Sequence, residues 1–115
     1  MTAQDFRRLA LELPEATESS HMSHPDFRVG GKIFATLGYP DEQWAMVKLP
    51  PLQQELLTKA APQVFVPVKG GWGRKGATNV RLKPAKKTQV RTALREAWAG
   101  IAPKRLVAAP RSAGR

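Results

Sequence analysis

Cysteine is absent from the chain. This absence excludes a disulfide scaffold, a thiolate metal site, a cysteine nucleophile and a thiol redox role. Long apolar runs are absent as well: none approaches the length of about 18 residues that a transmembrane helix needs. The first residues mix acidic with apolar side chains and lack the apolar core of a signal peptide. We therefore expect a soluble, cytoplasmic protein with no membrane contact.

Acidic residues are scarce in the second half of the sequence. The 115 residues carry 19 Lys and Arg against 9 Asp and Glu, a formal net charge of +10. Residues 61–115 hold thirteen of these bases and one acid, Glu96, whereas residues 1–60 hold six bases and eight acids. This asymmetry favours a polyanionic partner, although a basic surface also serves solubility alone.

Apolar periodicity and turn residues divide the sequence into eight elements. Helices are predicted before Pro14, between Pro51 and Pro62, and between Thr88, as N-cap, and Pro103. Alternating or apolar-rich runs predict strands at residues 27–29, 32–37, 44–49, 64–69 and 78–83.

The order α-β-β-β-α-β-β-α predicts an α+β domain with a mostly antiparallel sheet packed by helices. We assign residues 1–109 to one domain and expect residues 110–115 to form a flexible tail. Polar residues 15–26 are expected to form a loop. In the second predicted helix, apolar residues line one face, which we expect to pack on the sheet: Leu52, Leu56 and Ala60.

Residues 71–76 match the pattern Gly-x-Gly-x-x-Gly. In dinucleotide-binding proteins these glycines bring a pyrophosphate to a helix N-terminus inside a strand–turn–helix unit. Here a strand is predicted after the glycines, so we expect no nucleotide cofactor. We interpret the segment as a flexible loop with a basic tip between two strands.

Basic residues gather around this loop, because residues 69–87 contain seven Lys and Arg and no acid. A hairpin with a basic tip beside a basic helix edge could follow a phosphate backbone. The alternative is a solvated basic surface without a ligand. The candidate nucleic-acid contacts are Lys69, Arg74, Lys75, Arg81, Lys83, Lys86, Lys87 and Arg91.

The three tryptophans have different expected roles. Trp72 lies in the basic loop and could stack on a base, but we favour a structural role in covering the sheet edge. Trp44 in a strand and Trp98 on an apolar helix face are expected in the core.

His21 and His24 form a His-x-x-His pair. A metal site needs further ligands, and the sequence has neither a third histidine nor a cysteine, so no metal is expected. Serines close to these histidines in sequence do not by themselves make a catalytic triad. We predict no catalytic residue and no cofactor.

Several segments, in this order and spacing, resemble the YjbR/MmcQ family of small bacterial proteins. They lie within about residues 5–108 and are Leu13-Pro14-Glu15-Ala16, His24-Pro25-Asp26-Phe27-Arg28-Val29, Gly31-Lys32-Ile33-Phe34-Ala35-Thr36-Leu37, Gly71-Trp72-Gly73, Ala97-Trp98 and Ala102-Pro103-Lys104-Arg105-Leu106.

The resemblance implies an α+β fold similar to that of CyaY/frataxin, with β-hairpins in a "double wing" arrangement described as DNA-binding. It supplies no catalytic motif. Frataxin-type iron binding depends on an acidic first helix, whereas the first helix here also carries Arg7 and Arg8. Iron binding is therefore not expected.

The basic charge, the expected basic loop and the family resemblance together predict a non-enzymatic protein that binds nucleic acid, above all double-stranded DNA. We expect it to contact the phosphate backbone of the nucleic acid, with little base specificity. One alternative is a protein-interaction or small-ligand module whose basic face meets an acidic partner. Another is an enzyme that uses His21 or His24. We assume a monomer.

Overall fold

The computed structural model describes residues 1–107, apart from the side chain of His21. The expected tail at residues 110–115 lies outside the described residues, as do the last two residues of the expected domain. The elements in chain order are α1 (Ala3–Leu11), β1 (Thr17–His21), β2 (His24–Val29), β3 (Lys32–Leu37), β4 (Trp44–Lys48), α2 (Pro51–Ala60), β5 (Phe65–Pro67), α3 (Gly71–Arg74), β6 (Ala77–Arg81), α4 (Lys87–Ile101) and α5 (Lys104–Val107).

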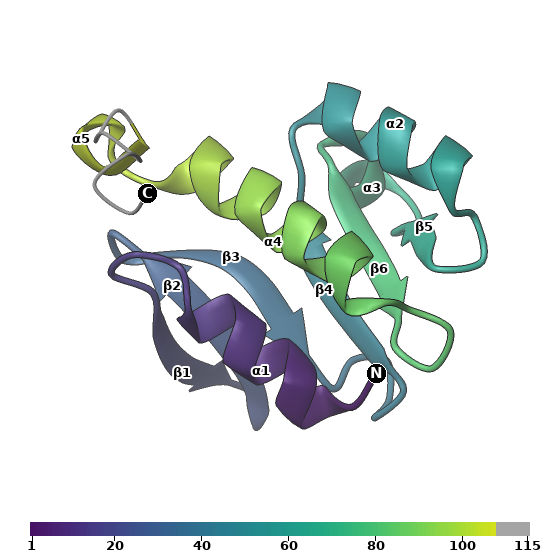
Figure 1. Cartoon of the computed structure of the whole chain (residues 1–115), viewed down its shortest axis with the longest axis horizontal. Coiled ribbons are helices and arrows are strands. Elements are labelled where there is room, and N and C mark those ends of the chain that lie inside the picture. Colours follow the sequence, from purple (N-terminus) through teal and green to yellow (C-terminus); the bar gives the residue numbers. More distant parts are fainter. Residues whose placement is uncertain (108–115) are drawn as a thin grey trace.

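The strands of the described residues form one six-stranded sheet in the order β1-β2-β3-β4-β6-β5. Every neighbouring pair is antiparallel. Helices α1 and α4 lie side by side across one face of this sheet, and α2 lies over its β5 end (Figure 1). The predicted α+β class with an antiparallel sheet is confirmed.

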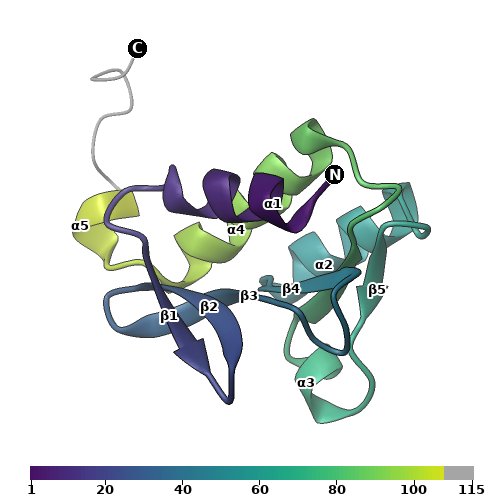
Figure 2. The ribbon, with the colours of Figure 1, turned by 90° about the horizontal axis from the view of Figure 1, so that it is seen from below.

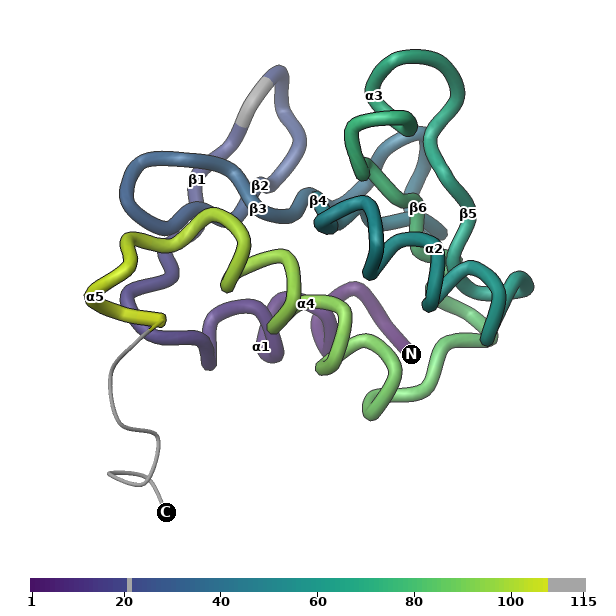
Figure 3. The backbone as a smooth tube through the Cα atoms, turned by 90° about the horizontal axis from the view of Figure 1, so that it is seen from above, coloured from purple at the N-terminus to yellow at the C-terminus, as the bar shows by residue number. Residues whose placement is uncertain are grey.

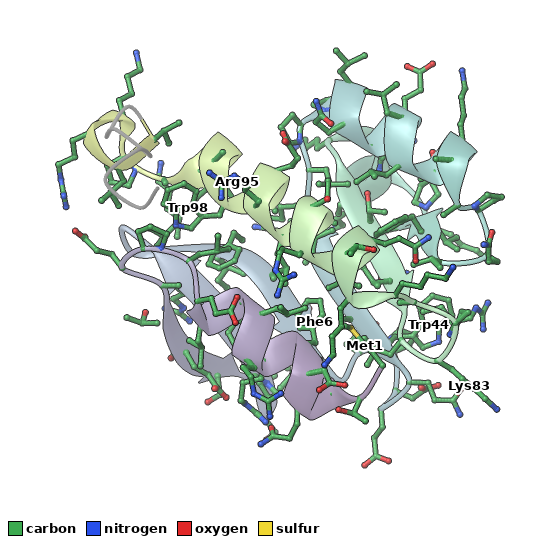
Figure 4. The ribbon with its side chains drawn as sticks, viewed as in Figure 1. Met1, Phe6, Trp44, Lys83, Arg95 and Trp98 are labelled. Atoms are coloured by element: carbon green, nitrogen blue, oxygen red, sulfur yellow. The ribbon has the colours of Figure 1, made fainter. Side chains whose placement is uncertain are left out.

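The core lies between the sheet and the pair formed by α1 and α4. Phe6 of α1 and Leu94 of α4 are fully buried, as the apolar spacing of both helices predicts. The ring of Phe6 packs against that of Phe27 on β2, with 6.1 Å between the centroids. Trp98 is also buried, as expected, and its Nε1–H donates to the carbonyl oxygen of Pro14 at 3.0 Å, toward the segment after α1 (Figure 4).

The expected loop at residues 15–26 is wrong, because it contains β1 and the start of β2. The two strands form a hairpin in which Thr17 pairs with Arg28 and His21 pairs with His24. β1 is an edge strand in which residues 17–20 are exposed on both faces, so its sequence shows no apolar alternation.

The expected inward face of α2 is also wrong. Leu52 and Leu56 are 65% and 53% exposed, and no residue of α2 is buried. The helix instead packs through half-buried residues such as Gln54 and Leu57. α4 begins one residue before the expected cap Thr88, because the Gln89 side chain accepts the backbone N–H of Lys86 at 2.9 Å.

Three predicted strands are shorter than expected. β4 ends at Lys48 rather than at Leu49. β5 covers three residues of the predicted run 64–69, and β6 ends at Arg81 rather than at Lys83. None of the helices in the described part of the chain is long and apolar enough to cross a membrane.

Candidate functional site

Within residues 1–107, no long helix covers the face of the sheet opposite α1 and α4 (Figure 2). On β4, Ala45 and Val47 point into the core, whereas Trp44, Met46 and Lys48 are half-buried on the other side. Their partners across β6 are, in the same order, Arg81, Asn79 and Ala77. We call the surface formed by these six residues the open face.

Two protrusions flank the middle of the sheet on this side. The turn of the β1–β2 hairpin projects on one flank and α3 on the other, with β3 and β4 between them, and two views show both on the same side of the sheet (Figures 2 and 3). The open face therefore lies between these two protrusions. We call residues 69–76, which include α3, the α3 arm.

The arm that carries α3 is a short helix rather than the expected loop. Its glycines allow close packing: a Cβ on Gly73 would lie 1.7 Å from the carbonyl oxygen of Val68, and one on Gly76 would lie 1.8 Å from that of Leu49. Gln54 of α2 donates from Nε2 to the carbonyl oxygens of Gly73, at 2.9 Å, and of Ala77, at 3.1 Å. Gly73 and Gly76 of the Gly-x-Gly-x-x-Gly pattern thus serve backbone packing.

Trp72 stands on this arm and is 67% exposed, so the expectation that it covers the sheet edge is wrong. The Nζ atom of Lys48 lies 5.8 Å from the centroid of its ring. Lys75 and Ala77 complete, with these two residues, the lining of a hollow of about 150 Å³. An aromatic ring and two cations therefore border one small concavity.

Trp44 is half-buried on the open face rather than in the core, where it was expected. The guanidinium carbon of Arg81 lies 4.4 Å from its ring centroid. This is a cation–π contact between neighbouring strands, made possible because the two residues are register partners.

Five basic residues of the open face and of the α3 arm have no ion-pair partner among residues 1–107: Lys48, Lys69, Arg74, Lys75 and Arg81. Six other cations are paired with a carboxylate: Arg7, Arg8, Arg28, Lys59, Arg91 and Arg105. Lys48 was missed from the sequence, although its two-residue spacing from Met46 and Trp44 places it on their face.

The structure separates the eight predicted contacts into two groups and one residue, Lys83, that lies between them in sequence. Lys69, Arg74, Lys75 and Arg81 belong to the open face and its arm. Lys83 lies in the loop after β6, at the edge of the molecule (Figure 4). The remaining three lie at the beginning of α4, beside α1: Lys86, Lys87 and Arg91.

Acidic residues of α1 and its C-terminal end accompany this second group. The Nη2 atom of Arg91 lies 3.9 Å from a carboxylate oxygen of Glu12. The backbone N–H of Thr2 lowers the pKa of Asp5 most, and the positive charge of Lys87 lowers it further. Nearby acids thus offset part of the positive charge at the start of α4.

The ring of His24 meets that of Tyr39 edge-on, with 5.7 Å between centroids. Asp26, fully buried, accepts from Nε and Nη2 of Arg28 at 2.8 and 3.1 Å, and this hydrogen-bonded contact raises the pKa of Arg28. Among the described side chains, which exclude that of His21, no three His, Asp or Glu residues are grouped to hold a metal ion.

A comparison with solved structures finds the same fold in the crystal structure of the Deinococcus radiodurans protein DR2400, which carries the family-model domain DUF419. The TM-score is 0.74 at 22% identity, over 97% of this chain and 86% of that one. No curated protein matches the sequence. The family model YjbR matches residues 11–99, from the end of α1 almost to the end of α4. That match spans the whole sheet and both protrusions, and it shows that the chain belongs to the YjbR family.

Proposed function

We propose that this protein binds nucleic acid through the open face and the α3 arm, without catalysing a reaction. The observation that supports this most is that five of the eleven Lys and Arg side chains without an ion-pair partner in residues 1–107 lie on or beside one uncovered sheet face. Such a surface attracts phosphates and releases their counterions.

Long, exposed Lys and Arg side chains suit contacts to the phosphate backbone of a nucleic acid. They are less suited to base readout, which needs side chains held rigidly at base edges. We therefore propose binding with little base specificity. Duplex DNA is the first ligand to test, because the two protrusions on either side of the basic open face could each meet a backbone strand.

Salt-dependent binding to a labelled duplex tests the proposal. Each phosphate contact contributes about −0.9 to the slope of log affinity against log salt, so four or five contacts predict a slope of about −4. The double variant Arg74→Ala, Lys75→Ala is expected to bind about ten-fold or more weakly, with a slope smaller by about 2. No detectable binding at low salt would contradict the proposal.

A matched variant, Lys87→Ala, Arg91→Ala, removes two charges from the helical side of the molecule. It lowers the net charge equally, and we expect at most a two-fold loss of affinity. Equal losses in the two double variants would show that net charge, and not the open face, governs binding.

A protein partner with an acidic surface is a second candidate, favoured by the exposed Leu52 and Leu56 on α2 next to the α3 arm. Polyglutamate carries charge without bases or phosphates. If it competes with DNA at equal charge concentration, and if Leu52→Ala, Leu56→Ala weakens a protein complex but not DNA binding, this second function is supported.

A further inference from the structure

The open face and the α3 arm together present two aromatic groups along one line. Trp44, Met46 and Lys48 alternate on β4, and a strand rises about 3.3 Å per residue, so Trp44 and Lys48 are about 13 Å apart. Trp72 lies over Lys48. An aromatic ring with its cation therefore stands at each end of the line, with the half-buried Met46 between them.

Trp72 combines high exposure with basic surroundings. Two thirds of this large ring face solvent, and two of the residues that border its hollow are lysines. The hollow, about 150 Å³, is well below the roughly 300–1,000 Å³ of pockets that enclose a whole small ligand. It suits one flat ring placed against Trp72, with an attached negative group near Lys48 and Lys75.

At the other end, Arg81 lies between the Trp44 ring and solvent, since Arg81 is exposed and Trp44 is half-buried. A guanidinium plane, like an aromatic ring, can stack on a nucleobase. This end also has acids nearby: Asp41 and Glu42 are exposed in the loop before β4. Phosphates are therefore expected on the side of β6 and α3, away from that loop.

Bases in a duplex are stacked on each other and offer only their edges in the grooves, whereas unpaired bases can lay their faces on aromatic or guanidinium groups. We infer that the open face binds single-stranded nucleic acid in preference to duplex, with one base on Trp72 and another on the Arg81–Trp44 pair. This inference rests on the proposed nucleic-acid binding and specifies its ligand.

Equilibrium titrations of the full chain with a labelled 12-nucleotide oligo-dT and with a duplex of equal length test the inference. We expect the single strand to bind about ten-fold more tightly at the same salt concentration. Trp72→Ala is expected to weaken single-strand binding about ten-fold, toward the lower end of the range for one stacked base, and to leave duplex binding within two-fold. Trp72→Phe should restore most of the affinity, because a smaller ring still stacks.

Tryptophan fluorescence gives a second readout. The single strand is expected to quench the emission of the natural protein, and much less that of Trp72→Ala. Leu52→Ala is the control: it removes a comparably exposed apolar side chain from α2 and should change neither affinity nor quenching. Circular dichroism should show all three variants folded, because Trp72 and Leu52 are exposed.

Two outcomes separate this inference from the function on which it rests. Tighter binding to the duplex, with Trp72→Ala neutral and Arg74→Ala, Lys75→Ala impaired, would overturn the single-strand inference and leave nucleic-acid binding standing. Failure of both ligands to bind at low salt would overturn both.

Discussion

The guanidinium of Arg81 lies over the ring of Trp44, with 4.4 Å from its central carbon to the ring centroid. The two residues are partners in the β4–β6 register, and neither side chain makes a hydrogen bond within residues 1–107 that would otherwise fix this arrangement. The pair therefore holds a cation against the open face and covers a tryptophan that the core does not enclose.

A double-mutant cycle measures this pair. Arg81→Met keeps an apolar side chain over the ring without the charge, and Trp44→Leu removes the ring. We expect a coupling of about 0.5–1 kcal/mol in the free energy of unfolding, the range for a cation–π contact at an exposed site. Urea denaturation followed by circular dichroism gives the four stabilities. Additive losses, with no coupling, would show that the contact contributes nothing to the fold.

The glycines of the α3 arm lead to a second prediction. Gly73→Ala places a methyl group 1.7 Å from the carbonyl oxygen of Val68, and the backbone cannot yield locally because Gln54 also binds the Gly73 carbonyl. We expect a loss of about 3 kcal/mol in the free energy of unfolding, the upper end for overpacking. Denaturation midpoints measure it.

Gly71→Ala is the matched control on the same short helix. An added Cβ there meets only the end of the Arg74 side chain, at 3.7 Å, which is ordinary contact. Its stability should stay within about 0.5 kcal/mol of the natural protein. Equal effects at the two positions would mean that helix propensity, and not the approach to Val68, sets the requirement for glycine.

These contacts show which features the sequence could and could not predict. The apolar stripe of α4 and the strand at residues 32–37 were correctly predicted because each depends on local spacing. β1 was missed because an edge strand exposed on both faces needs no alternation. The helix α3 was missed because three of the six residues at 71–76 are glycine, which disfavours helix, and its packing depends on Val68 and Leu49.

The sequence drew attention to only part of the candidate site for the same reason. Charge density along the chain selected residues 69–81, which lie on or beside the open face, and also the start of α4, which the fold places beside α1 and its acids. It did not select Lys48, a single base in an otherwise apolar strand. Only the folded structure shows that Lys48, Trp72 and Lys75 border one hollow.

The turn of the β1–β2 hairpin gives a third prediction. Met22 and Ser23 connect the strands with φ angles of 51° and 70°, values that cost a residue with a side chain roughly 1–2 kcal/mol. Met22→Asn, Ser23→Gly supplies the residues that two-residue turns with positive φ prefer. We expect a gain of about 1 kcal/mol in stability, measured by urea denaturation.

The turn at Gly30-Gly31, between β2 and β3, provides the opposite control. Gly31 has a φ of 79° and no atom within 4 Å of an added Cβ, so Gly31→Ala introduces strain alone. It should lower stability by about 1 kcal/mol. If the Asn-Gly variant were less stable than the natural protein, the exposed Met22 side chain would have to make a stabilising contact that outweighs the strain.

The ion pair between Glu15 and Arg105 predicts a dependence on pH. Nη1 and Nη2 of Arg105 donate to the two carboxylate oxygens at 3.1 and 3.0 Å, which lowers the pKa of Glu15 below its ordinary value. Because the pKa is lower in the folded than in the unfolded chain, the pair stabilises the fold above the ordinary glutamate value and loses this effect as the pH falls through the lowered one. Arg105→Gln should return the Glu15 pKa toward its ordinary value. The chemical shift of the Glu15 carboxyl group, measured by NMR during an acid titration, reports this change. A Glu15 pKa that is equally low in Arg105→Gln would show that the pair does not hold α5 to the segment after α1 in solution.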